Sequence, residues 1–175
     1  ESSAASDVYK RQHSALSDSI MTAKVLNIVK KKQPETWESF FKTANKSDTE
    51  TIIKKGEIIT LNEYYYGKSR LHLVAPLHQK YCMHPIYAGW YYAFDLRIDI
   101  KPLLNLSINE LKVEMKKSPK FLRTIRSNKA PIIVDAKYGM KAEPYSAMDK
   151  SLINKRADIV KNNEKFSQNI LHALR

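Results

Sequence analysis

The feature that most constrains the fold is a set of short runs in the middle of the chain that are rich in β-branched and aromatic residues. They are EIITLNEYYY from residue 57, RLHLVAPL from residue 70, WYYAFDLRID from residue 90 and APIIVDA from residue 130. Gly, Pro and Asn bound these runs, and their residue types favour strands. Four or more short strands predict a small barrel or sandwich.

Helical patterns flank the strands. No Gly or Pro interrupts residues 13–32, and Pro34 ends this helix after three lysines that suit its negative end. Its apolar coverage is broad, which predicts packing against a larger body on more than one side. A second helix is predicted over residues 35–45, with Trp37, Phe40 and Phe41 on its inner face.

Two more helical segments complete the pattern. Ser107 and Glu110 form a capping box at the start of SINELKVEMKK, which ends before Pro119. The segment 151–175 is again helical, and the candidates for burial in it are Leu152, Ile153, Ile159, Phe166, Ile170 and Leu171. Strands with flanking helices predict an α+β fold.

Charge and cysteine usage narrow the function. The chain has 30 Lys and Arg against 18 Asp and Glu, a formal net charge of +12. Such an excess indicates a polyanion partner, most often nucleic acid, with simple solubility as the alternative. The single cysteine, Cys82, excludes an internal disulfide and fits a reducing compartment. No apolar run approaches the ~20 residues of a membrane span, so we expect a cytoplasmic protein.

One candidate binding segment combines aromatic and basic residues. EYYYGKSR places three tyrosines beside two cations, a combination that proteins use to hold single strands, because bases stack on the rings and the cations meet phosphates. Strand alternation predicts that at least one of the tyrosines is buried. The residues are Tyr64, Tyr65, Tyr66, Lys68 and Arg70.

A second candidate segment is a basic run. Seven Lys and Arg between residues 112 and 129 meet one acidic residue, Glu114. Arg123, Arg126 and Lys129 lie in and after a short extended piece and are predicted to contact phosphates. The alternative is a solvated charged face.

Metal-ligand residue types also gather in the strand region. His72, His78, Cys82 and His84 lie within 13 residues, and four such ligands could close a zinc site. Their spacing matches no standard finger and no second thiol is present. Cys82 is better interpreted as a small buried apolar residue, and WYYAFDL as a core strand.

A catalytic motif is possible at the start of the first helix. His13, Ala15 and Asp18 form the pattern H-x-A-x-x-D. The histidine could act as a general base that deprotonates a water, and the carboxylate could hold a divalent cation. A helix cap and a solvated side chain are the alternative.

The surrounding sequence adds a family resemblance. HSALSDSIMTAKVLNIVKKKQP resembles the last active-site helix of the DEDDh exonucleases in its exonuclease I form. VAPL from residue 74, HP from residue 84, DLRIDIKPLLNLSINELK from residue 95 and NKAPIIVDA from residue 128 resemble the domain that follows the nuclease domain in bacterial exonuclease I. The resemblance extends from His13 to the end of the chain.

The resemblance implies both a function and a division of the chain. It implies an enzyme that removes nucleotides from single-stranded DNA in the 3′ to 5′ direction, with His13 as general base and Asp18 as a ligand of two Mg²⁺ ions. The strands and the tyrosine hairpin would form an SH3-like β-barrel that lines the DNA groove, with flanking helices. The expected domains are the last helix of an RNase H-like nuclease domain (13–33), the accessory domain (34–150) and the start of a helical region (151–175).

The first residues need a separate interpretation. SSAASDVYKRQ, from Ser2 to Gln12, matches the codon-by-codon translation of a transposase-end sequencing adapter, so residues 1–12 are expected to be an artefact or a disordered tail. The family also needs an Asp-x-Glu pair and another Asp, and nothing before His13 supplies them. We therefore expect an inactive fragment. We also expect a monomer.

Two alternatives to this function remain open. One is a stand-alone basic nucleic-acid-binding module without catalysis, and the other is a domain that binds a peptide. The salt dependence of binding separates these two, because phosphate contacts weaken steeply with salt.

Overall fold

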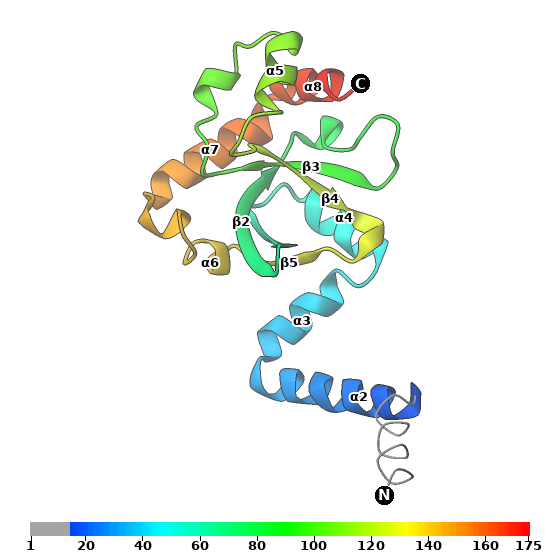
Figure 1. Cartoon of the computed structure of the whole chain (residues 1–175). Coiled ribbons are helices and arrows are strands. Elements are labelled where there is room, and N and C mark those ends of the chain that lie inside the picture. The colour runs from blue at the N-terminus through cyan, green and yellow to red at the C-terminus, as the bar shows by residue number, and fades with distance from the viewer. Residues whose placement is uncertain (1–14) are drawn as a thin grey trace, which may run out of the picture. The chain divides into compact units, whose positions relative to one another are not determined.

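The computed structural model describes residues 15–175, which divide into two compact units at Glu38 (Figure 1). The first unit holds helix α2 (Ala15–Lys32) and the beginning of α3 (Pro34–Lys42). Both helices lie where the sequence predicts them. The predicted artefact at residues 1–12 and His13 lie outside the described residues.

The apolar face of the first helix is exposed rather than packed. Leu16, Ile20 and Val25 are 72%, 47% and 55% exposed, and none of the residues of α2 is buried. In the next helix Trp37 is half-buried, whereas Phe40 and Phe41, which were also predicted on its inner face, are 51% and 59% exposed.

The second unit is built on a five-stranded antiparallel sheet with the order β4-β3-β2-β1-β5 (Figure 1). Its strands are β1 (Ile59–Tyr65), β2 (Lys68–Pro76), β3 (Trp90–Asp95), β4 (Leu122–Arg126) and β5 (Ile132–Asp135). The four apolar runs give four of these strands, and the short extended piece of the basic run gives β4. The register pairs Glu63 with Arg70 in β1–β2 and Trp90 with Arg126 in β3–β4.

The sheet is curved but open. β4 and β5 follow one another in the chain, yet they form opposite edges of the sheet and do not pair with each other. The link from Arg126 to Ile132 has six residue steps, so it reaches at most about 22 Å when fully extended. In a flat sheet the four strand spacings between β4 and β5 would span about 19 Å, which only a nearly extended link could cross. Because residues 127–129 form a compact 3₁₀ turn, the sheet must curl to bring its edges together. The α+β class is confirmed, whereas a closed SH3-like barrel is not.

Helices cover the sheet and complete the core. They are α4 (Lys46–Lys54), α5 (Ile108–Glu114), the short α6 (Ala136–Gly139), α7 (Lys150–Asn162) and α8 (Glu164–Ala173). α7 packs on β2, and α8 packs on α5. The ring centroid of Phe94 lies 5.8 Å from that of Phe121 and 6.2 Å from that of Phe166, so strand and helix share one core.

Local signals explain several helix ends. The capping box of Ser107 and Glu110 is confirmed. Sequence reasoning missed α4, whose N-cap Asn45 accepts a hydrogen bond from the Asp48 N–H. The predicted C-terminal helix is two helices that meet at Asn163, which caps α8 by accepting from the Phe166 N–H.

The burial predicted for the C-terminal segment is mostly confirmed. Four of its candidates are buried, Ile159 is half-buried and Leu152 is 40% exposed, so the last was wrong. The buried four are Ile153, Phe166, Ile170 and Leu171. None of the helices between residues 15 and 175 is long and apolar enough to cross a membrane.

Candidate nucleic-acid interface

A basic pocket of about 420 Å³ opens between β1 and β4. Lys120, Arg123, Arg126 and Lys129 line it together with Tyr65, and Glu63 is the one carboxylate in its lining. The sheet order separates β1 from β4 by two strands, so the curl of the sheet brings these side chains to a common hollow. We call this hollow the basic pocket.

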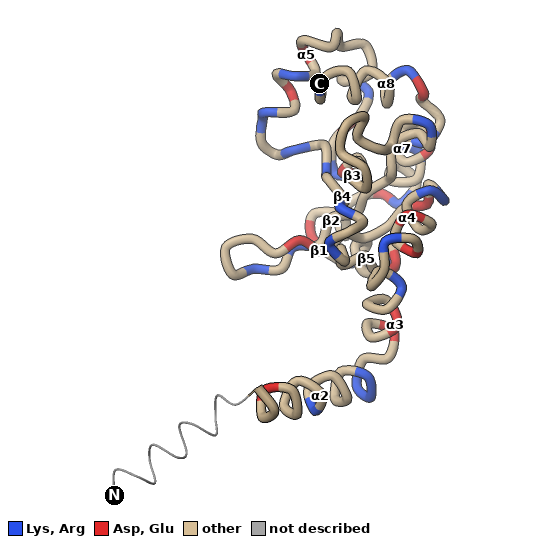
Figure 2. The backbone as a smooth tube through the Cα atoms, turned by 90° about the vertical axis from the view of Figure 1, so that its right-hand side faces the viewer, with Lys and Arg blue, Asp and Glu red and all other residues tan. Residues whose placement is uncertain are grey.

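The β1–β2 hairpin extends from the sheet beside the basic pocket. Figure 2 shows the hairpin projecting from the body of this unit, on the same side as basic segments of the α5–β4 connection. β5 pairs with β1 only as far as Asn62, so the end of the hairpin has a neighbour on one side alone. Its turn places Tyr66 and Gly67 at φ of 49° and 75°, the left-handed conformation that tight hairpins require.

The three tyrosines of this hairpin are all exposed. Tyr64, Tyr65 and Tyr66 are 73%, 43% and 100% exposed, so the prediction that at least one is buried was wrong. Strand alternation buries a face only where a second layer covers it, and the hairpin extends past the edge of the core. Partial desolvation of the Tyr65 hydroxyl, together with the negative charge and a hydrogen bond of Glu63, raises the pKa of Tyr65.

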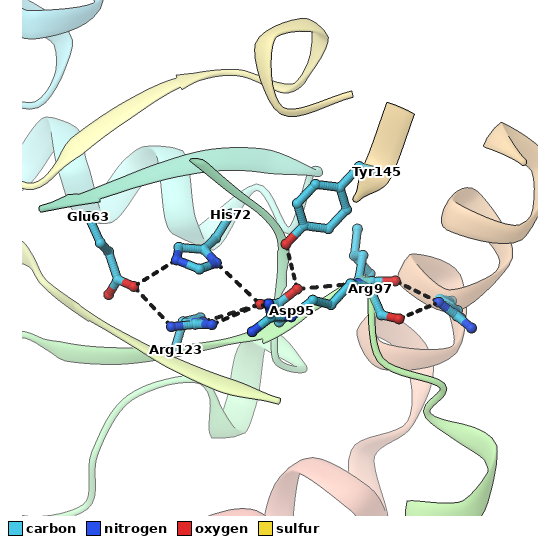
Figure 3. Close-up of polar contacts among 8 residues, drawn as sticks. Glu63, His72, Asp95, Arg97, Arg123 and Tyr145 are labelled. Carbon is cyan, nitrogen blue, oxygen red and sulfur yellow. Dashed lines mark hydrogen bonds and ion pairs between the residues drawn. The ribbon is translucent and has the colours of Figure 1, made fainter. Parts of the chain in front are cut away.

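Arg123 is an internal residue rather than a free cation. Its side chain is 11% exposed, and its Nη1 lies 3.1 Å from Glu63 Oε2 while its Nη2 lies 3.1 Å from Asp95 Oδ2 (Figure 3). The guanidinium thus joins β4 to β1 and to the end of β3. Because two carboxylates neutralise it, Arg123 supports the wall of the basic pocket more than it adds positive charge.

Asp95 is the centre of this buried network. It is 0% exposed, its Oδ1 accepts a 2.6 Å hydrogen bond from the Tyr145 hydroxyl, and its Oδ2 lies 3.3 Å from His72 Nδ1 and 3.2 Å from Arg97 Nε (Figure 3). Burial alone would raise its pKa. Hydrogen bonds from His72 and Tyr145 and the charges of Arg97 and Arg123 outweigh burial and hold the pKa of Asp95 below its ordinary value.

The remaining cations of the basic pocket have no carboxylate partner among the described residues. The guanidinium carbon of Arg126 lies 4.2 Å from the ring centroid of Trp90, a cation–π contact that leaves the N–H groups at its edge accessible. Lys129 is exposed at the end of the 3₁₀ turn that follows β4. These two residues, with Lys120, give the pocket its positive charge.

The structure brings together four of the predicted DNA-binding residues: Tyr65, Arg123, Arg126 and Lys129 all line the basic pocket. Tyr64, Tyr66 and Lys68 lie further along the hairpin, and Arg70 lines a separate hollow with Arg97 and Tyr145. Sequence reasoning left out Lys120, which belongs to the same basic run.

The predicted catalytic motif cannot be assembled from the described residues. Asp18 is exposed in the first turn of α2, and His13 lies outside them. No three His, Cys, Asp or Glu side chains in residues 15–175 lie close enough to hold a metal ion. The carboxylates of this part of the chain therefore do not fit a complete two-metal centre by themselves.

The zinc alternative finds no support in the geometry. His72 contacts Glu63 and Asp95, and Cys82 is buried, as its interpretation as an apolar residue predicted, and donates to the Gln79 carbonyl. His78 caps the 3₁₀ turn Gln79–Tyr81, and His84 accepts two backbone N–H bonds at its Nδ1. The predicted core strand is also confirmed, since residues 91–96 are buried.

Comparison with known proteins adds the family evidence. No protein-family model matches the chain. The chain is 27% identical over 178 residues to exodeoxyribonuclease I of Buchnera aphidicola subsp. Acyrthosiphon pisum, covering 93% of the chain and 40% of that protein. It is 28% identical over 145 residues to exodeoxyribonuclease I of Haemophilus influenzae, covering 74% of the chain and 29% of that protein. The chain therefore spans less than half the length of these curated relatives.

Solved structures agree on the fold. Exonuclease I from Methylocaldum szegediense superposes with a TM-score of 0.71 at 22% identity, over 93% of the chain and 37% of that protein. E. coli exonuclease I in complex with a 5cy-dT13 oligonucleotide superposes with a TM-score of 0.68 at 19% identity, over 92% of the chain and 37% of that protein. A zinc-bound form of the E. coli enzyme with single-stranded DNA superposes with a TM-score of 0.65 at 20% identity, over 92% of the chain and 37% of that protein. The resemblance to exonuclease I that the motifs predict is thus confirmed in sequence and fold.

Proposed function

We propose that this chain is a C-terminal portion of a bacterial exonuclease I and that its second unit holds single-stranded DNA in the basic pocket. The observation that carries the proposal is the lining of this pocket. Lys120, Arg126 and Lys129 supply uncompensated positive charge beside Tyr65, while the one carboxylate, Glu63, is paired with Arg123. The cations can neutralise the phosphates of a DNA strand, and an unpaired base can stack on the tyrosine ring.

Single strands fit this arrangement better than duplexes. The tyrosines of the hairpin offer exposed rings, and only an unstacked base can present its face to such a ring. The E. coli relative has been solved with an oligonucleotide in place, which supports the same class of ligand here. We interpret the open, curled sheet as an SH3-like accessory domain with residues 34–150 as its extent.

In the parent enzyme, the roles of the first helix follow from the motif. We propose that His13 serves as the general base that deprotonates water and that Asp18 is one ligand of the Mg²⁺ ions, together with carboxylates from other parts of the enzyme. Metal ions would stabilise the charge that develops on the phosphate. Because the described residues offer no complete metal centre, we expect the chain alone to be inactive.

The proposal is tested by fluorescence anisotropy of a labelled single-stranded oligonucleotide with the full chain, at 50 and 200 mM salt and with a duplex competitor. Binding through six or more phosphates should weaken about 10³-fold or more between these salt concentrations. A preference for the single strand is expected. Absence of binding at 50 mM salt would contradict the proposal, and a partner that binds independently of salt would favour a peptide-binding domain.

A further inference from the structure

The loop of residues 83–90, which we call the aromatic loop, presents apolar surface next to the basic pocket. Met83, Ile86 and Tyr87 in this loop are 45%, 69% and 53% exposed. The loop contains no acidic residue, and it ends at Trp90, the residue under the guanidinium of Arg126. Because Arg126 also lines the basic pocket, the aromatic loop continues the lining of that pocket onto the surface.

The aromatic loop is held in one conformation by His84. This side chain is 6% exposed, and its Nδ1 accepts hydrogen bonds from the Ile86 N–H at 3.0 Å and the Tyr87 N–H at 3.1 Å. The backbone N–H of His84 donates to the Trp90 carbonyl at 2.7 Å, and that of Trp90 donates to the Tyr87 carbonyl at 3.1 Å. Four hydrogen bonds within eight residues hold the backbone that carries the Tyr87 ring.

The rings of the aromatic loop form one cluster. The centroid of Tyr87 lies 4.6 Å from that of His84 and 4.9 Å from that of Trp90, with the ring planes tilted by 40° and 37°, and the guanidinium of Arg126 lies over the Trp90 ring. Gly89 connects this cluster to the residue that follows Arg126 at the end of β4, because its carbonyl accepts from the Ser127 N–H at 2.8 Å. A Cβ on Gly89 would lie 2.9 Å from Ser127 Oγ, so the close approach requires glycine.

We propose that the aromatic loop is a second nucleic-acid subsite, in which Tyr87 stacks an unpaired base of the strand whose phosphates Arg126 and Lys129 contact. This inference rests on the proposed function and extends it to a residue outside the basic pocket. A ring that is fixed in advance loses little conformational freedom when a base stacks on it. Glu50 on α4 accepts from Ser127 and pairs with Lys46 and Lys54, so this carboxylate is neutralised and the surface favours a polyanion.

The test compares two labelled strands of equal length, oligo(dT) and a strand in which every base is replaced by an abasic site. The wild-type chain should bind oligo(dT) more tightly. Tyr87→Ala should weaken binding of oligo(dT) about 5- to 150-fold and leave the abasic strand unchanged, because only stacking is removed. Tyr87→Phe keeps the ring and should bind as the wild type does. Phe40→Ala is the matched control, since Phe40 is 51% exposed and lies outside the subsite.

A spectroscopic measurement gives an independent readout. The chain has two tryptophans, so Trp37→Phe leaves Trp90 as the sole indole reporter. Addition of oligo(dT) should change the Trp90 emission in this background, and Tyr87→Ala should reduce the change at saturation.

The outcomes separate this inference from the proposed function. Tight binding of oligo(dT) that is unaffected by Tyr87→Ala would overturn the subsite and leave the basic pocket intact. Equal affinity for both strands would overturn it as well, because no base would then contribute. Displacement by polyglutamate at equal charge would show a surface open to acidic peptides, contrary to the inference. Failure to bind either strand would refute the proposed function together with the subsite.

Discussion

The hydrogen bond between Tyr145 and Asp95 provides a direct test of the buried network. Tyr145→Phe removes one hydroxyl and leaves the ring, which is 2% exposed, in place. The lost bond is 2.6 Å long and ends on a carboxylate that is 0% exposed.

The expected magnitude follows from these contacts. A hydrogen bond to a charged group contributes about 1.5–3 kcal/mol to stability. Asp95 keeps the Arg123, Arg97 and His72 contacts, so the cost should stay within this range, about 2–3 kcal/mol. For a chain of this size that corresponds to a fall of about 5–10 °C in Tm.

Urea denaturation followed by circular dichroism measures the change in the free energy of unfolding. Tyr92→Phe is the control, because Tyr92 is 4% exposed on the same sheet and no carboxylate accepts from its hydroxyl among the described residues. A loss below about 0.5 kcal/mol for Tyr145→Phe, equal to that of the control, would refute the view that Asp95 depends on this bond. Asp95→Asn should cost more, about 3–5 kcal/mol, since it leaves buried cations uncompensated.

Four further predictions concern charge, pH and catalysis. Arg126→Ala and Lys129→Ala should each reduce the slope of log K against log salt concentration for single-strand binding by about one. Lys155 is an exposed cation on α7, and Lys155→Ala should leave this slope unchanged. Equal effects of all three substitutions in anisotropy titrations would contradict the placement of the basic pocket. Folding lowers the pKa of Asp95, so the stability that this carboxylate contributes is present at a pH above the ordinary value of 3.8 and is lost as the pH falls below it. The urea midpoint, measured from pH 6 to pH 2.5, should therefore decrease below about pH 4. A midpoint that does not change with pH would argue against the network. Burial lowers the pKa of His84, so the neutral ring, which accepts two N–H bonds, stabilises the chain fully at a pH above the ordinary value of 6.5 and less as the pH falls below it. Trp90 emission in the Trp37→Phe background should report this loss of stability. His84→Asn should abolish the pH dependence of the emission. The pure chain should not degrade a labelled oligonucleotide in Mg²⁺, and degradation that EDTA abolishes would refute the expected inactivity.

Local sequence signals predicted much of the architecture. The apolar runs gave β1, β2, β3 and β5, and the capping box gave the start of α5, because each depends on neighbours in the chain. The helix α4 was missed since its apolar residues are few and Ile53 alone among its large side chains is buried. The helix begins after its N-cap Asn45, and asparagine is favoured both in turns and at helix N-caps, so this residue alone does not indicate a helix start.

The failures concern contacts between distant residues. Alternation along β1 could not reveal that the hairpin extends past the second layer, so the exposure of all three tyrosines was missed. The role of Arg123 likewise depends on Glu63, 60 residues away, and on Asp95, 28 residues away. A basic run indicates charge, but only the curvature of the sheet decides which of its members faces solvent and which is neutralised.

The open sheet has a consequence for how copies of this chain meet. Unpaired edge strands can join the edges of other molecules and so nucleate aggregates. Here both edges are short, with five residues in β4 and four in β5. β4 carries the exposed Arg126, and the five residues 127–131 link it directly to β5. Charge on one edge and the brevity of both leave little template for a foreign strand, so a basic residue that suits a polyanion also opposes self-association through the sheet.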